Sequence, residues 1–233
     1  MKQKNVKKEI ARIFSDPTHP KFFLVNDFFA ILTILSVLVV VLETVPGLEK
    51  YDLAFFVIEW FSVTLFSIEY ISRLWSTNPP RKYAFSFFGI IDLLSILPSF
   101  LGVGNLTFLK SARALRIIRL LRLVRTSSVK AHEKEEEYNP IAFNVLIYFA
   151  ALLFALLVFG TAMYVFEPSE TFASIPAGMW WSFKVFLASI PVDQPTTAIG
   201  DGLYVLTRFV GLMLLGLLIG VVGNVFRILI GNK

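Results

Sequence analysis

The sequence predicts an all-α membrane protein, and three observations support that fold class. The chain of 233 residues is 56% hydrophobic and 17% charged, whereas soluble domains average about 45–50% apolar and about 25% charged residues. Its apolar residues are gathered into runs near the length of a membrane span, and its basic residues gather in alternate connections between those runs. This composition excludes a secreted domain, a disordered tail and an ordinary cytosolic enzyme.

Six segments account for the predicted spans, since a helix needs about 20 apolar residues to cross the bilayer core. In order, the segments are 22–42, 53–75, 85–100, 106–124, 141–166 and 203–230. Five of them meet or approach this length, and the fourth, 106–124, is unusual because it is basic. Between the last two, residues 177–188 form an apolar helix that is too short to cross. Pro191 and Pro195 prevent that helix from continuing.

The distribution of basic residues predicts the orientation. Basic residues precede the first span and follow the second, fourth and last spans, and they are Lys2, Lys4, Lys7, Lys8, Arg12, Arg73, Arg81, Lys82, Lys130, Lys134, Arg227 and Lys233. By the positive-inside rule, both termini and an N-terminal helix within residues 1–20 are expected in the cytoplasm of a multi-pass cell-membrane protein. Two cytoplasmic termini require an even number of spans, so the basic segment is counted as one.

Residues that carry catalytic or metal-binding chemistry are scarce. The chain has no cysteine, so it has no disulfide, thiolate nucleophile or Cys-ligated zinc site. Its two histidines, His19 and His132, lie far apart in polar segments, and residues 102–105 are too short to form a phosphate-binding glycine loop. We therefore expect no enzyme activity and no cofactor.

A cation recurs at every third position of the fourth segment. The residues between are small or apolar, and the cations are Lys110, Arg113, Arg116, Arg119, Arg122 and Arg125. In an α-helix a step of three drifts by about 60°, so the charges wind as a spiral, whereas a 3₁₀ helix with about three residues per turn aligns them in a straight stripe. The spacing alone leaves both forms open.

Four interpretations of this segment compete. A DNA-binding helix would have a polar remainder, and this one is apolar, so no nucleic-acid partner is expected. An amphipathic helix lying on an anionic membrane would leave an odd number of spans, and a static helix held by ion pairs is the third interpretation. We favour a transmembrane voltage sensor, because arginines at membrane depth are costly and need partners.

Acidic partners for the cations are present on two other spans. Glu59, Phe66 and Glu69 lie on one face of the second span, and Asp92 lies inside the third. Each carboxylate would be costly to bury alone and is compensated if it faces the arginine ladder. Phe66 is spaced to place an apolar ring between two acidic sites, so we expect the ladder to step past Phe66 and exchange carboxylates.

Several motifs together resemble the voltage-gated potassium channel family, especially its compact prokaryotic members. They are FSIEYISRLW, FGIIDLLSILPSF, the arginine repeat, IPAGMWWSF and LLIGVVGNVFRILIG, and they cover most of the chain from residue 22 to residue 230. The resemblance implies a homotetramer in the lipid bilayer that conducts an inorganic ion, with a four-helix voltage-sensor domain and a two-helix pore domain containing a re-entrant pore helix. It also implies that the six cations are gating charges, that Glu59, Phe66, Glu69 and Asp92 form the charge-transfer centre and countercharges, and that Gly211 is a gate hinge.

The selectivity filter departs from the family pattern. Potassium channels use the backbone carbonyls of a Thr-Val-Gly-Tyr-Gly sequence. The tryptophans of the pore helix are kept here, but the region has neither glycine nor tyrosine after them, and it contains Trp180, Trp181, Lys184, Ala188, Ser189, Ile190, Pro191, Val192, Asp193 and Gln194. Since proline restricts the dihedrals that glycine permits, the usual potassium filter cannot form from this sequence.

Four charged residues near the filter leave its ion preference open. In a fourfold assembly Asp193 would form a ring of carboxylates, as in sodium- and calcium-type filters. The alternatives are salt bridges of Asp193 or Asp201 with Lys184 or Arg208, within or between subunits, and a Lys184 or Arg208 ring that favours anions. The overall resemblance therefore implies potassium, whereas the local chemistry contradicts it.

The predicted organisation is a sensor domain at 1–126, a linker at 127–138 and a pore domain at 139–233. The linker is charged rather than amphipathic, which makes coupling of sensor to pore harder to predict than sensing itself. A non-potassium or non-selective channel is the first alternative function. A voltage-responsive scaffold with a collapsed pore is the second, and a transporter is disfavoured because no inverted repeat is visible.

Overall fold

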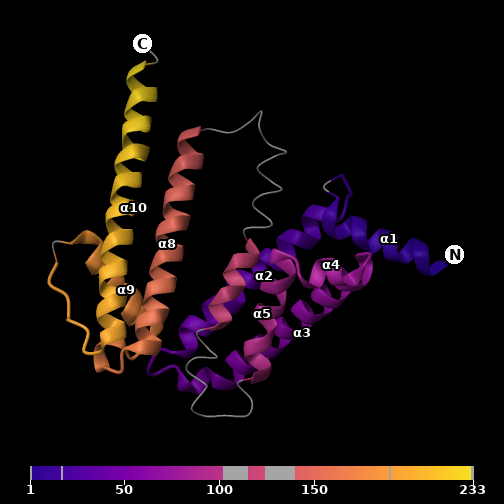
Figure 1. The fold of residues 1–233 in the computed structure, drawn as a ribbon, viewed down its shortest axis with the longest axis horizontal. Helices are drawn as coiled ribbons and strands as arrows, with labels where there is room; N and C mark the ends of the chain where they lie inside the picture. Colours follow the sequence, from indigo (N-terminus) through magenta and orange to yellow (C-terminus); the bar gives the residue numbers. More distant parts are fainter. Residues whose placement is uncertain (1, 17, 102–114, 124–139, 189, 232–233) are drawn as a thin grey trace. The chain divides into compact units, whose positions relative to one another are not determined.

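The computed structural model describes residues 2–16, 18–101, 115–123, 140–188 and 190–231. Every regular element in these ranges is a helix, as the composition predicts. The elements are α1 (Lys2–Ser15), α2 (Phe22–Glu43), η1 (Glu49–Tyr51), α3 (Asp52–Ser76), α4 (Pro80–Ala84), α5 (Phe87–Leu101), η3 (Arg116–Leu121), α8 (Pro140–Phe166), η4 (Glu170–Phe172), α9 (Ile175–Leu187) and α10 (Ala198–Gly231) (Figure 1).

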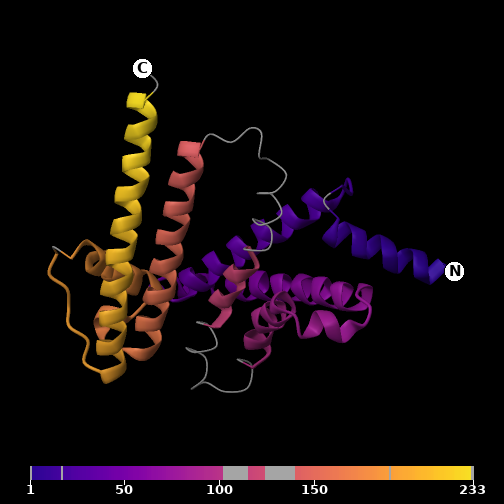
Figure 2. The same cartoon turned by 45° about the horizontal axis from the view of Figure 1, so that its top comes forward.

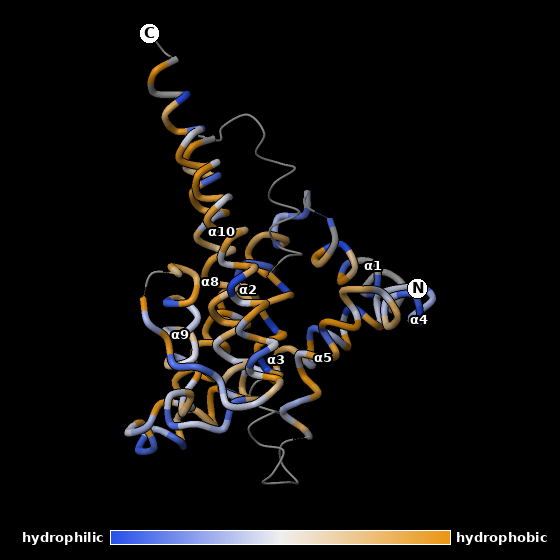
Figure 3. The backbone as a smooth tube through the Cα atoms, turned by 60° about the vertical axis from the view of Figure 1, so that its left-hand side comes forward, coloured by the Kyte–Doolittle hydropathy of each residue, from blue (hydrophilic) through white to orange (hydrophobic). Residues whose placement is uncertain are grey.

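Four of these helices are long and apolar enough to cross a membrane: 22–43, 49–76, 141–166 and 198–227. A shorter apolar helix occupies 87–100, in place of the third predicted span. Figure 3 shows the apolar character of α8 and α10 along most of their length. The chain is therefore an all-α, multi-pass membrane protein, while the predicted count of six spans remains a prediction because most of the basic segment lies outside the described residues.

The described residues divide into two compact units. The first contains α1 to α5 and η3, and the second contains α8, η4, α9 and α10. In the first unit η3 packs against α2 and α5, and its Arg119 side chain reaches Glu59 on α3 (Figures 1 and 2). Its core is formed by Leu32, Val63, Phe66 and Ile96, so the ring singled out in the sequence is also a central packing residue.

In the second unit α9 packs between the lower parts of α8 and α10 (Figure 2). Helix α9 begins two residues before its predicted start, because Pro176 is tolerated in a first helical turn and the Ser174 hydroxyl caps the helix by accepting from Ala177 N at 3.3 Å. The helix ends at Ala188, whose φ of 54° is left-handed. Helix α10 begins before its predicted start because the Thr197 hydroxyl accepts from Gly200 N at 2.9 Å.

Candidate functional site

Part of the cation repeat is a 3₁₀ helix. Residues Arg116–Leu121 form η3, and Arg122 and Leu123 continue it as a helical turn. Of the six predicted gating charges the structure describes Arg116, Arg119 and Arg122; Lys110, Arg113 and Arg125 lie outside the described residues. Side chains three apart eclipse in a 3₁₀ helix, so Arg116 and Arg119 lie along one edge rather than on a spiral.

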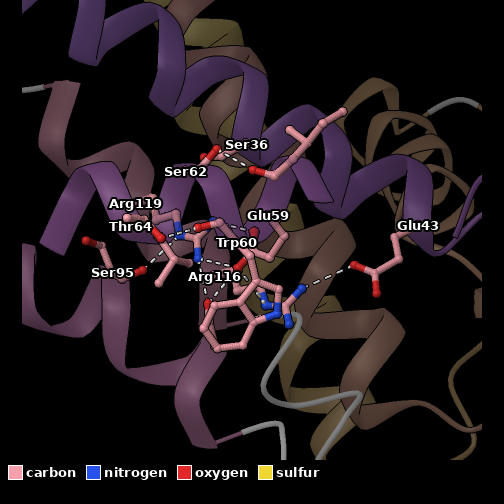
Figure 4. Close-up of polar contacts among 12 residues, drawn as sticks. Ser36, Glu43, Glu59, Trp60, Ser62, Thr64, Ser95, Arg116 and Arg119 are labelled. Atoms are coloured by element: carbon pink, nitrogen blue, oxygen red, sulfur yellow. Dashed lines mark hydrogen bonds and ion pairs between the residues drawn. The ribbon is translucent and has the colours of Figure 1, made fainter. Parts of the chain in front are cut away.

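Arg119 is fully buried and forms the most extensive contacts of the three. Its Nη1 and Nη2 donate to the two carboxylate oxygens of Glu59 at 2.8 and 2.6 Å, and its Nε donates to the Ser95 carbonyl at 2.8 Å. The Ser99 hydroxyl accepts from Arg119 Nη2 at 2.8 Å and donates to Glu59 Oε1 at 2.6 Å. This paired, two-pronged geometry is the arrangement that lets a guanidinium be buried (Figure 4).

Arg116 lies one step towards the end of α2. Its Nη1 donates to Glu43 Oε2 at 3.2 Å, and its Nε is 3.4 Å from Glu59 Oε1. Figure 4 shows Arg116 reaching towards Glu43, with Glu59 and Arg119 on its other side. Glu59 therefore faces two successive cations of the repeat.

Arg122 lies on the other side of Glu59 along the repeat. Its Nε donates to Asp92 Oδ1 at 2.7 Å and its Nη2 donates to Glu69 Oε2 at 3.0 Å. The Phe66 ring, which has no exposed surface, lies 5.8 Å from the Arg119 guanidinium and 4.3 Å from that of Arg122. The structure thus brings all four predicted partners, Glu59, Phe66, Glu69 and Asp92, into contact with the repeat.

Several residues of this site carried no prediction. Arg73, four residues after Glu69 on α3, is buried, and its Nη2 lies 2.8 Å from Glu69 Oε1. Ser95 and Ser99 follow Asp92 on one face of α5, and this spacing is a signal that sequence reasoning could have used. Glu43 is the last residue of α2. With Arg73 and Glu43 included, two carboxylates and two guanidinium groups lie on each side of Phe66.

Tyr83 is another such residue, and it supports Asp92 from α4. Its hydroxyl donates to Asp92 Oδ2, while Asp92 Oδ1 accepts from Arg122. A Cβ at Gly89 would collide with the Tyr83 carbonyl, so the glycine permits this turn to approach α5 closely. The turn between α3 and α5 therefore holds a second donor against a buried carboxylate.

Replacing Tyr83 by Phe is expected to lower the free energy of unfolding by about 2 kcal/mol, because a hydrogen bond to a charged buried group is lost without a change of shape. Thermal unfolding of the full chain in detergent, followed by circular dichroism, measures the effect. Tyr70→Phe is the matched control, since the Tyr70 ring lies 6.1 Å from that of Tyr83. Equal melting temperatures for the two variants would contradict the assigned role.

The second unit contains the predicted pore and filter residues. Trp181 is buried between Phe172 and Tyr204, at ring distances of 5.3 and 5.7 Å, and its indole Nε1 donates to the Asp193 carbonyl at 2.9 Å. Trp180 is exposed and stacks on Phe183. The indole of Trp181 therefore fixes the backbone of Asp193.

Lys184 lies inside α9, and the filter residues that follow this helix form no regular element. Residues 190–195 are irregular, the backbone turns at Ala188, and Ser189 lies outside the described residues. Asp193 is exposed. Among the described residues of the chain, no ion pair joins Lys184, Asp193, Asp201 or Arg208; Arg208 instead lies 5.1 Å from the Tyr204 ring. A salt bridge within one subunit therefore finds no support in these contacts.

Gly211, the predicted hinge, lies inside the continuous helix α10. A Cβ at this position would lie 2.9 Å from the Phe186 Cα atom. Close packing of α10 against α9 is thus a sufficient structural reason for the glycine, whether or not the helix bends there.

Glu167 is a further buried carboxylate, at the end of α8. It accepts from the backbone N and hydroxyl of both Thr196 and Thr197, with 2.8 Å to Thr196 N and 3.2 Å to Thr197 N. Burial raises the pKa of Glu167, but these hydrogen bonds outweigh it and hold the pKa below the ordinary value. The carboxylate also lies at the N-terminus of α10, where negative charge is favoured.

Because the folded-state pKa of Glu167 is lowered, its stabilisation is present above the unfolded pKa and is lost as the pH falls through the folded value. We expect Glu167→Gln to lower the stability of the chain by about 2 kcal/mol at neutral pH. Below about pH 4 the difference from the wild type should shrink. Melting temperatures across this pH range test it, with exposed Glu170→Gln as control; a difference independent of pH would contradict it.

Comparison with known proteins gives one family and several relatives. The family described as "Ion transport protein" matches residues 23–229. A provisionally named potassium channel protein of Rhodopseudomonas palustris is 31% identical over 231 residues, covering 90% of this chain and 55% of its own length.

Two human proteins are also similar. The A-type voltage-gated potassium channel KCND3 is 27% identical over 69% of this chain and 27% of its own length. The voltage-gated potassium channel regulatory subunit KCNF1 is 25% identical over 65% of this chain and 35% of its own length. The chain therefore spans about half of the bacterial relative and about a third or less of the human ones.

Proposed function

The chain belongs to the ion transport protein family, and from that premise we propose that it is a voltage-gated cation channel that conducts ions as a homotetramer. In this proposal residues 1–126 sense voltage, 127–138 link the domains, and 139–233 form the pore. Two relatives named as potassium channels, of which the human one is named as voltage-gated, support a channel-like function. The exposed apolar surfaces of α8 and α10 support contact with lipid and with neighbouring subunits.

The observation that carries the proposal is the neutralised stripe of arginines around Phe66. Three residues of a 3₁₀ helix rise about 6 Å. Because the stripe is straight, a shift by one step places Arg119 at the position of Arg116 or of Arg122 without rotation, and each position already has carboxylates. The free-energy cost of such a step is limited, since a guanidinium that passes the Phe66 ring exchanges one set of carboxylates for another and does not end in an apolar site.

The membrane field supplies enough energy to drive such steps. One elementary charge that crosses 100 mV is worth about 2.3 kcal/mol. If three charges cross in each of four subunits, the field contributes about 28 kcal/mol. We therefore assign Arg116, Arg119 and Arg122 as gating charges, together with Lys110, Arg113 and Arg125 on the grounds of spacing.

The permeant ion is a separate question, because the filter sequence differs from that of potassium channels. The indole of Trp181 fixes the Asp193 backbone, and the exposed Asp193 carboxylate forms no ion pair with any residue that the structure describes. In a fourfold assembly four such carboxylates would surround the axis, which favours cations over anions. We propose a cation-selective pore in which Asp193 contributes the charge, and Gly211 remains the candidate gate hinge.

Reversal potentials under bi-ionic gradients of potassium, sodium, calcium and chloride test this assignment. We expect cations to permeate with weak discrimination between potassium and sodium, because no glycine-based carbonyl filter is available. Asp193→Asn should reduce cation over chloride selectivity, and Asp201→Asn is the matched control. Strong preference for potassium over sodium, or an Asp193→Asn variant with unchanged selectivity, would contradict the assignment.

A voltage-responsive subunit without ion conduction is the second candidate. One relative is named as a regulatory subunit, and Pro191 and Pro195 restrict the segment that follows the pore helix. Single-channel recording of the purified protein separates the two candidates, because a regulatory scaffold stays silent at every potential.

A further inference from the structure

The N-terminal helix α1 has a two-sided pattern that voltage sensing does not use. Lys4, Lys8 and Arg12 recur at every fourth residue and so share one face of the helix. Val6, Ile10, Ile13 and Phe14 share the opposite face. The helix contains five basic residues and one acidic residue, so its net charge is +4. We call Lys4, Lys8 and Arg12 the basic stripe.

The C-terminal part of the apolar face of α1 packs within the first unit. The helix packs against α2 and α3, and the Phe14 ring lies 6.5 Å from that of Phe29. Arg12, which shares a helical face with Lys4 and Lys8, lies opposite Phe14 on α1. The Arg12 side chain is 60% exposed, and its Nε lies 3.3 Å from Asp16 Oδ2. A surface ion pair of this type contributes little to stability.

The turn after α1 holds the stripe close to the start of a membrane span. Six residues separate Ser15 from Phe22, where the apolar helix α2 begins. The buried His19 ring lies 3.1 Å from Glu9 Oε1, and the Thr18 backbone N donates to Asp16 Oδ1 at 3.1 Å. The His19 contact ties the turn back to α1, so α1 stays close to the first residues of the α2 span.

We infer that the basic stripe binds anionic lipid headgroups of the leaflet at which α2 begins. Clusters of four or more basic residues beside a membrane span attract anionic lipids, with about 1 kcal/mol for each Lys or Arg near the surface. The basic stripe and the two other lysines of α1 together form such a cluster of five. Lipid fits better than an acidic protein or a nucleic acid, because Phe14 of the apolar face already packs within the first unit and α1 directly precedes a membrane span.

A contact path connects α1 to the gating residues, and its functional meaning rests on the proposed function. The Arg73 guanidinium lies 4.3 Å from the Phe14 ring, and its Nη1 donates to the Phe14 carbonyl at 3.4 Å. Arg73 holds Glu69 Oε1, and the second oxygen of Glu69 accepts from Arg122. A lipid-dependent change in the position of α1 would therefore act on a carboxylate that a gating arginine uses.

Lipid binding is tested without reference to current. The chain has no cysteine, so Asn5→Cys carries a single fluorophore beside the stripe. In liposomes, headgroup-spin-labelled phosphatidylglycerol should quench this fluorophore more strongly than spin-labelled phosphatidylcholine at equal content. Lys4→Gln with Lys8→Gln should reduce the preference about 10- to 30-fold, whereas Arg81→Gln with Lys82→Gln should leave it unchanged. Equal quenching by both lipids, or an unchanged preference in the Lys4 and Lys8 double variant, overturns the inference.

Transmission to the sensor is tested by the voltage of half-activation with and without phosphatidylglycerol. The lipid should shift this midpoint more in the wild type than in Phe14→Leu, which keeps an apolar contact but removes the ring beneath Arg73. An equal shift in both proteins would show that the lipid acts only through the surface potential of the membrane. It would overturn the inference that lipid binding at α1 affects the sensor. If lipid preference is found in a protein that shows no voltage response, the binding inference stands and the proposed function fails.

Discussion

Replacing Arg116, Arg119 and Arg122 together by Gln is expected to flatten the voltage dependence of the current in a planar bilayer. Each arginine lost removes up to about 2.3 kcal/mol of coupling per 100 mV in each subunit. Open probability plotted against voltage should become shallow, because the charges that cross the field are reduced. Unchanged steepness would count against the sensor role and in favour of a static helix held by ion pairs.

Two further variants separate lost charge from lost folding. The same three positions changed to Lys keep the charge but not the forked hydrogen bonds, so the steepness should persist. Arg119→Gln combined with Glu59→Gln removes one gating charge and leaves no unpaired carboxylate there. This double variant should fold and show a smaller loss of steepness than the triple Gln variant.

Replacing Glu59 by Leu alone is expected to destabilise the first unit by about 3–5 kcal/mol, because it leaves a buried charge without its partner. Arg119 has no exposed surface and would keep only the Ser95 carbonyl and the Ser99 hydroxyl. The melting temperature of the full chain in detergent measures the effect. Glu49→Leu, at an exposed carboxylate in η1, should change it little.

A double-mutant cycle between Glu59 and Arg119 isolates the pair. Changing both to Leu should recover part of the stability lost in Glu59→Leu, with an interaction energy of about 2–3 kcal/mol. Additive effects of the two single changes would show that the observed contact is not an energetic unit.

The membrane class was predictable from composition because long apolar runs have few other folds available. The predicted carboxylates could also be found, since Glu59 and Glu69 share a helical face and buried charges need partners. The choice between α and 3₁₀ geometry could not be made from the repeat, because a period of three suits both. In the structure Arg119 lies in a 3₁₀ helix and contacts Glu59, Ser95 and Ser99. Those contacts join three separate segments of the chain, so the repeat alone does not reveal them.

Two of the residues that escaped prediction, Tyr83 and Glu167, lack a periodic signal of their own. Tyr83 lies on a five-residue helix, and only the turn at Gly89 brings it to Asp92. Glu167 sits alone before Pro168, and its partners, Thr196 and Thr197, are about thirty residues away. Arg73 was used only as evidence for orientation, although its spacing of four from Glu69 is typical of a helical ion pair.

The most direct test of the central claim is the sidedness of a cysteine at position 119. The chain has no native cysteine, so Arg119→Cys provides a single reactive site beside Phe66. A charged thiol reagent applied from one side of the membrane should modify it at one polarity of voltage, and reagent from the opposite side should modify it at the other. Modification from the same side at both polarities, at equal rates, would contradict movement of the arginine stripe past Phe66.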